Sequence, residues 1–132
     1  MDDEIFKLTT YDGRYDYLLD VELPKLEIMR SVGLKTHIEK RHPNCISYFD
    51  KIQEIIDAPD YVGCNPNEPN SFELVKKYDD NLMIAIKLDM KNNYYYVATL
   101  HEVKQSKVNN RLNSGRLKPL NQSVLNNKNT SE

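Results

Sequence analysis

The sequence lacks the long apolar runs that cross membranes. No apolar stretch approaches the roughly 20 residues that a bilayer requires, and the mean hydropathy is -0.69. The first ten residues, MDDEIFKLTT, are acidic and carry no apolar stretch typical of signal peptides. We therefore expect a cytoplasmic protein with no membrane partner.

Cysteine is also scarce. Cys45 and Cys64 are the two cysteines among 132 residues, too few for a disulfide framework and typical of a reducing compartment. His42 and His101 could in principle join them as four zinc ligands, but no second closely spaced ligand pair exists. Phosphate-loop, nucleophile-elbow and dinucleotide-binding motifs are missing as well. We predict no metal and no cofactor.

A strong excess of charge is absent too. The net charge is -2 and the isoelectric point about 5.9, which argues against a strongly basic nucleic-acid binder. The distribution is uneven, because residues 103–132 sum to +5 and the first 102 residues sum to -7. Such asymmetry indicates either a solvated face or a local anion site.

The length fits one domain with a short tail. We expect an N-terminal extension over residues 1–30, a folded domain over 31–120 and a disordered tail over 121–132. We expect the extension to contain a strand, a short helix and another short strand over 26–29. Expected helices start at Gly33 and at Cys45 and end before Pro43 and Pro59.

Four strands follow these helices and should pair as an antiparallel meander. Their expected ranges are 60–64, 71–78, 82–89 and 94–103, and a last helix over 104–112 ends at Ser114 and Gly115. The predicted fold is α+β, with the two helices on one face of a four-stranded antiparallel sheet. The opposite face carries polar and cationic groups and is where a ligand could bind.

Alternation assigns the faces of the last two strands. Leu82, Ile84 and Ile86 should share one face, and Met83, Ala85 and Lys87 the other. In the last strand, strict alternation places two sets of side chains on opposite faces. One set is Tyr94, Tyr96, Ala98 and Leu100, and the other is Tyr95, Val97, Thr99 and His101.

Three groups of residues could carry chemistry. His37 and Arg41 align on one helix face, and His42 follows. Imidazole suits acid–base catalysis near neutral pH, although a basic helix end is also a common solvated structure.

The second group surrounds a Ser-Gly turn and contains Arg111, Ser114, Arg116 and Lys118. Paired guanidinium donors and an approachable backbone suit phosphate, while ordinary basic capping of a helix remains the alternative.

The third group is a polar row formed by Lys87, Thr99 and His101. Lys87 interrupts an apolar strand, which a guard against aggregation would also explain. Tyr96 lies in a run of three tyrosines that could stack bases, although core packing is the more ordinary role of such a run.

Several motifs in order over residues 31–120 resemble a phage and mobile-element family of nuclease-like domains. This family is grouped with the barnase, EndoU, colicin and RelE ribonuclease fold. The motifs are GLKTHIEKRHP (33–43), PDYVG (59–63), NPNEPNSFEL (65–74), DNLMIAIKL (80–88) and NRLNSGRL (110–117). The resemblance implies two helices followed by a four-stranded antiparallel sheet.

It also implies a metal-independent ribonuclease, in which a base activates the RNA 2′-OH and an acid protonates the leaving 5′-oxygen. His37 or His42 would be the acid or base. The expected phosphate clamps are Arg41, Lys87, Arg111 and Arg116. Thr99 and Ser114 would donate hydrogen bonds, and Lys118 and Tyr96 would contact RNA.

Two other functions stay open. A nuclease-like scaffold without activity could inhibit a host defence enzyme or act as an immunity factor, since an acidic region suits a basic protein surface. The sheet could instead bind RNA without cutting it. The partners in view are therefore RNA, a host defence enzyme, a cognate immunity protein and a second copy of the chain.

Overall fold

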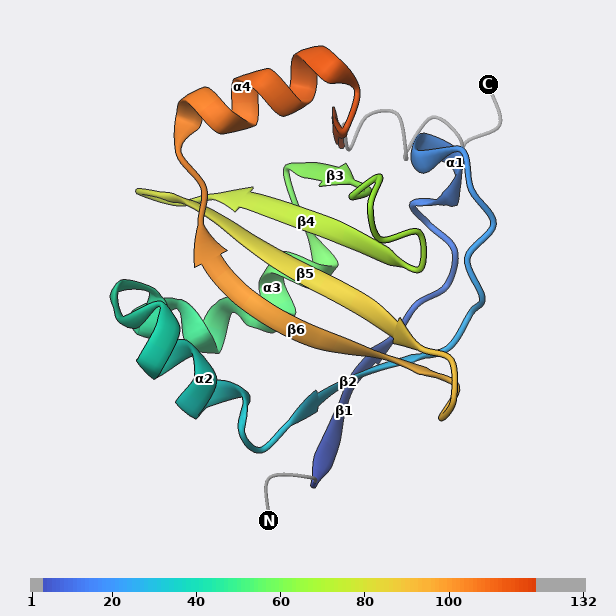
Figure 1. Ribbon diagram of the computed structural model, residues 1–132, viewed down its shortest axis with the longest axis vertical. Helices are drawn as coiled ribbons and strands as arrows, with labels where there is room; N and C mark the ends of the chain where they lie inside the picture. Colours follow the sequence, from blue (N-terminus) through green and yellow to red (C-terminus); the bar gives the residue numbers. More distant parts are fainter. Residues whose placement is uncertain (1–3, 121–132) are drawn as a thin grey trace.

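The computed structural model describes residues 4–120 and contains one seven-stranded mixed sheet, in the order β1-β2-β6-β5-β4-β3-β7 (Figure 1). The predicted tail, 121–132, lies outside the described residues. The strands are β1 Ile5–Thr10, β2 Glu27–Ser31, β3 Tyr61–Gly63, β4 Ser71–Lys77, β5 Asn81–Asp89, β6 Tyr94–Glu102 and β7 Leu117–Pro119. The helices are α1 Asp16–Leu19, α2 Leu34–Arg41, the 3₁₀ helix η1 Pro43–Lys51, α3 Ile52–Asp57 and α4 Gln105–Ser114.

The predicted four-stranded antiparallel architecture is wrong. Strands β3 to β6 do pair as antiparallel neighbours, but β2 pairs in parallel with the start of β6, and β1 pairs with β2. Strand β7 extends the other edge by pairing with β3. The parallel pair of β2 and β6 joins segments that are far apart in the chain, so no local sequence pattern predicts it.

One face of the sheet forms the main core. Leu82, Ile84 and Ile86 are fully buried there, which confirms the predicted alternation of β5. Helices α2, η1 and α3 cover this core face and contribute Leu34, Ile38, Cys45, Ile52, Ile55 and Ile56.

The segment predicted as one helix from Cys45 to Asp57 is divided. Its first part is the 3₁₀ helix η1, and α3 follows it. Ile46, Phe49, Ile52 and Ile55 recur every three residues, which matches the three residues per turn of a 3₁₀ helix.

Strand β6 does not alternate strictly as predicted. Ala85 pairs with Thr99 and Ile86 with Val97, so Ala98 is an extra residue and forms a β-bulge. The bulge shifts the side chains by one position, and Tyr95, Val97 and Leu100 all join the main core. Directly paired residues share a face, so Tyr96, Thr99 and His101 lie with Lys87, Ala85 and Met83 on the opposite face.

That opposite face is called the α4 face here, because α4 packs on one end of it. Val108 of α4 is buried against Val75 and Met83, which pair across β4 and β5. Helix α4 ends as predicted at Gly115, whose φ of 85° reverses the chain toward β7. Figure 1 shows α4 starting just beyond the end of β6, with α2 at the opposite side of the view.

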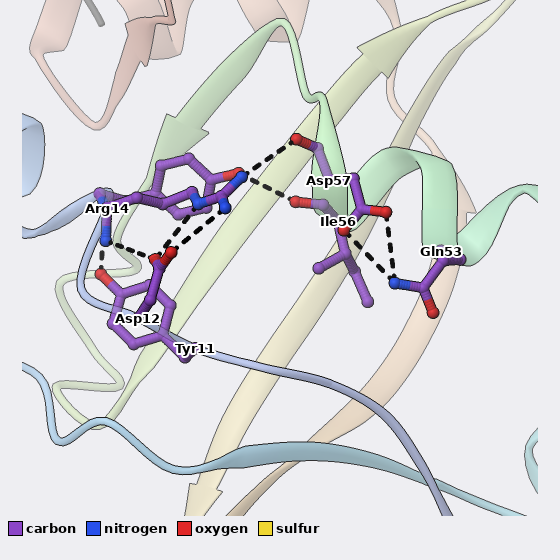
Figure 2. A network of polar contacts seen from close by, with 7 residues as sticks. Tyr11, Asp12, Arg14, Gln53, Ile56 and Asp57 are labelled. Atoms are coloured by element: carbon purple, nitrogen blue, oxygen red, sulfur yellow. Dashed lines mark hydrogen bonds and ion pairs between the residues drawn. The ribbon is translucent and has the colours of Figure 1, made fainter. Parts of the chain in front are cut away.

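The N-terminal segment is linked to α3, on the core face, by hydrogen bonds to backbone carbonyl groups of that helix. The buried hydroxyl of Tyr15 donates a hydrogen bond to the carbonyl oxygen of Ile56 at 2.9 Å. Arg14 pairs with Asp12 and also donates to the carbonyl oxygen of Asp57 at 3.4 Å (Figure 2). Among residues 4–120, no helix is long and apolar enough to cross a bilayer.

Candidate active site

The strongest polar interaction on the α4 face joins Glu73 of β4 to Arg116. The Arg116 Nε donates to Glu73 Oε1 at 3.1 Å, and Nη2 donates to Oε2 at 2.7 Å. Glu73 is 4% exposed. The bidentate bond raises the pKa of Arg116 above its ordinary value, so the guanidinium stays charged. A buried carboxylate with a fixed counter-ion is thus held on β4, between β5 and β3.

Two glycines place Arg116 over Glu73. Gly63 of β3 has no side chain, and a Cβ there would lie 2.1 Å from the Arg116 carbonyl oxygen. That carbonyl accepts a hydrogen bond from the Cys64 amide at 3.2 Å. At the other side of Arg116, Gly115 adopts the left-handed conformation that ends α4. The chain therefore returns to the sheet edge with only Gly115 and Arg116 between α4 and β7.

A row of paired residues leads from Glu73 across the sheet to Thr99. Glu73 pairs with Ala85, and Ala85 pairs with Thr99, so the three side chains share the α4 face. The side chain of Ala85 is a single methyl group. It therefore does not cover the larger side chains of Glu73 and Thr99 on either side of it. The Thr99 hydroxyl oxygen is buried and has no hydrogen-bond partner among the described residues. Such an unpaired group in a native structure calls for an explanation, and a bound ligand is one.

His101 lies one step further along β6 on the same face. Its ring nitrogen Nδ1 is likewise buried and has no partner within residues 4–120. Burial lowers the pKa of His101 below its ordinary value; His42, Arg111 and Lys107 act in the same direction. Glu73 opposes this shift. A histidine shifted by burial and by named charges is a candidate for acid–base chemistry.

Arg111 adds a second guanidinium from the last turn of α4. Its Nη1 lies 3.5 Å from the Met83 sulfur, which fixes the side chain against the α4 face. Burial and the nearby charge of Arg116 lower the pKa of Arg111, while Glu73 raises it. Two guanidinium groups therefore approach one carboxylate, which leaves positive charge available for an anion.

The structure brings only part of the first predicted group to this site. The His42 ring lies 5.3 Å from the His101 ring, measured between centroids. His37 is one histidine further away, with its ring 6.4 Å from that of His42. Arg41 is exposed, and its side chain has no hydrogen-bond or ion-pair partner in the described part of the chain.

The other predicted residues are divided between the site and its surroundings. Ser114 donates to the Arg111 carbonyl oxygen and accepts from the Arg116 amide, so it shapes the turn. Lys118 pairs with Val62 in register and thus lies on the core-face side of β7.

Lys87 and Tyr96 lie beside the site on the α4 face, around a hollow of about 230 Å³. Lys87 is not free there, because its ammonium pairs with Glu68 at 2.9 Å. Its role as a phosphate clamp stays a prediction.

Sequence reasoning left Glu73 and His101 out of the expected active site. Glu73 had a signal, since it is the one charge within the run Phe72-Glu-Leu-Val75. His101 belonged to the recognised polar row, yet its approach to His42 depends on how α2 packs beside β6. Within residues 4–120, no group of three or more histidine, cysteine or acidic residues could hold a metal ion.

Comparison with known proteins identifies the class of this domain as nuclease-like. The model of the family described as phage-Barnase-EndoU-ColicinE5/D-RelE like nuclease3 matches residues 12–110. The chain belongs to this family. The resemblance seen in the sequence is thereby confirmed, and the match starts within the first 30 residues. No curated protein and no solved structure matches the chain.

Proposed function

We propose that the chain is a metal-independent endoribonuclease whose reaction centre lies on the α4 face between Glu73 and His101. The observation that carries the proposal is the convergence of a buried carboxylate, two guanidinium groups and an unpartnered histidine nitrogen on one face. Cleavage of RNA at a phosphate needs a base, an acid and stabilisation of developing negative charge. These residues supply all three.

Glu73 is the base in this proposal. Its carboxylate removes the proton from the 2′-hydroxyl of RNA, and the resulting alkoxide attacks the adjacent phosphorus. A 2′,3′-cyclic phosphate forms as the bond to the 5′-oxygen breaks. Protonated His101 donates its proton to that leaving oxygen.

The cations stabilise the pentacoordinate phosphate that forms between these steps. Arg111 and Arg116 approach it from the end of α4 and from the turn before β7. The Thr99 hydroxyl, unpartnered in the described structure, donates a hydrogen bond to a phosphate oxygen. The assignment of Arg111, Arg116 and Thr99 follows the sequence-based prediction. In place of His37 or His42, His101 is the acid, and His42 is its neighbour.

The test is cleavage of mixed RNA by the purified protein in EDTA, with detection of 2′,3′-cyclic phosphate ends. Glu73→Gln retains the shape of the side chain and one of the two hydrogen bonds from Arg116, because the amide oxygen accepts and the amide nitrogen does not; it cannot act as a base. We expect it to fold and to lose activity by about 10²-fold or more. A protein that leaves RNA intact, or a fully active Glu73→Gln variant, contradicts the proposal. Absence of cleavage would favour the alternative, a scaffold that binds a host defence enzyme.

A further inference from the structure

We propose that a hollow between the end of β6 and the start of α4 binds a second phosphate of the RNA, one that flanks the cleaved phosphate. This inference rests on the proposed function and extends its site. The hollow, called the α4 hollow here, measures about 470 Å³, which is within the range of small-ligand sites. Its wall includes His101, Glu102, Lys104, Ser106, Lys107 and Asn110.

The charge of the α4 hollow favours an anion. Within residues 4–120, the ammonium groups of Lys104 and Lys107 have no hydrogen-bond or ion-pair partner. Glu102 is the acidic side chain in the wall, and its carboxylate already accepts a hydrogen bond from the Asn44 amide at 3.1 Å. The wall therefore carries two ammonium groups without an ion-pair partner and one carboxylate, which leaves it with a net positive charge.

The same cations form a stripe that leads to the reaction centre. Lys107 and Arg111 are four residues apart and share one side of α4, and Lys104 is the residue that immediately precedes this helix. The stripe starts at the α4 hollow and ends where Arg111 contacts the Met83 sulfur on the α4 face. A phosphate backbone that follows this stripe meets positive charge at each step.

His101 connects the two places directly. It lines the α4 hollow, and it lies on the α4 face next to the row that contains Glu73 and Thr99. Ser106 and Asn110 add a hydroxyl and an amide to the wall, both suited to phosphate oxygens. A nucleotide held across His101 would therefore present one phosphate to each side of this residue.

The first test measures binding of inorganic phosphate by NMR, without any cleavage. We expect saturable shifts of the Ser106 and Lys107 amide signals. The variant Lys104→Gln/Lys107→Gln should bind phosphate at these amides about tenfold more weakly. The control Lys40→Gln/Lys51→Gln removes the same charge from α2 and η1 and should bind as the unmodified protein does. Unshifted amides, or equal weakening in the control, would overturn the inference.

The second test distinguishes an RNA phosphate from free phosphate. It compares binding of a 2′-O-methyl dinucleotide, with one phosphate, and a 2′-O-methyl trinucleotide, with two. The trinucleotide should bind several-fold more tightly to the unmodified protein, and Lys104→Gln/Lys107→Gln should remove this advantage. An advantage that survives the substitutions overturns the inference, even where Glu73→Gln abolishes cleavage as the proposed function requires. Loss of the advantage in a protein that cuts no RNA would instead refute only the proposed function.

Discussion

Arg116 and Glu73 join the turn after α4 to strand β4 by two parallel hydrogen bonds, of 3.1 Å and 2.7 Å. The Glu73 side chain is 5% exposed and that of Arg116 is 24% exposed. Both side chains of this pair are therefore largely shielded from water, in contrast to the exposed side chains of Arg14 and Asp12. Removing one partner of a buried pair leaves the other charge without compensation.

We expect Arg116→Ala to lower the free energy of unfolding by about 3 kcal/mol, because Glu73 would stay buried and unpaired. Urea denaturation measures this change. Arg14→Ala is the matched control, since its pair with Asp12 is exposed and such pairs contribute about 1 kcal/mol or less. Equal losses in the two variants would show that the Glu73 pair is no more important than a surface pair.

Gly63→Ala should displace β7 and so move Arg116 away from Glu73. The added Cβ would lie 2.1 Å from the Arg116 carbonyl oxygen, and overpacking of this kind costs about 1–3 kcal/mol. Hydrogen exchange of the Cys64 amide, which donates to that carbonyl, should become faster. At Gly115 a Cβ meets no atom within 4 Å, so Gly115→Ala adds backbone strain alone and should leave the Cys64 amide protected.

Tyr15→Phe tests whether the N-terminal segment contributes to the stability of the domain. The hydroxyl is buried, and burial raises the pKa of Tyr15 to about 12, so it remains a hydrogen-bond donor to Ile56. Its loss leaves the Ile56 carbonyl unsatisfied and should cost about 1–3 kcal/mol by thermal unfolding. Tyr94→Phe, at a partly exposed position of β6, is the control and should change stability little. A loss in Tyr94→Phe as large as that in Tyr15→Phe would contradict this account.

The activity should decline with rising pH at an unusually low pH. Burial lowers the pKa of His101 below its ordinary value of about 6.5, and the proposed acid must be protonated. The profile of kcat/KM reports the groups of the free enzyme, so its alkaline limb should titrate below pH 6.5. His42→Asn removes one neighbour that lowers this pKa and should move the limb to higher pH. If the alkaline limb keeps its position in His42→Asn, His42 does not influence the pKa of His101, and this account is contradicted.

Local patterns in the sequence predicted a helix between Gly33 and Pro43, the alternation of β5 and the end of α4, because each depends on neighbouring residues. They failed in β6, where one extra residue, Ala98, shifts every side chain before it. The parallel pairing of β2 with β6 was also missed, since it depends on packing between distant segments.

The candidate site shows the same division. Arg111 and Arg116 were recognised, because both flank a short turn in the chain. Glu73 was missed because its partner, Arg116, is 43 residues away. Lys118 was included because it is near Arg116 in sequence, but alternation along β7 places it on the other face. Distance in the chain, rather than residue type, limited the prediction.

The most direct test of the central claim compares RNA cleavage by His101→Ala and His37→Ala in EDTA. The account predicts that His101→Ala loses about 10²-fold or more of kcat, while its circular dichroism and thermal unfolding stay close to those of the unmodified protein. His37→Ala should lose far less, because the His37 ring lies next to the His42 ring, and it is His42 whose ring lies next to His101. A folded His101→Ala variant with full activity, or a loss found only in His37→Ala, would contradict the account.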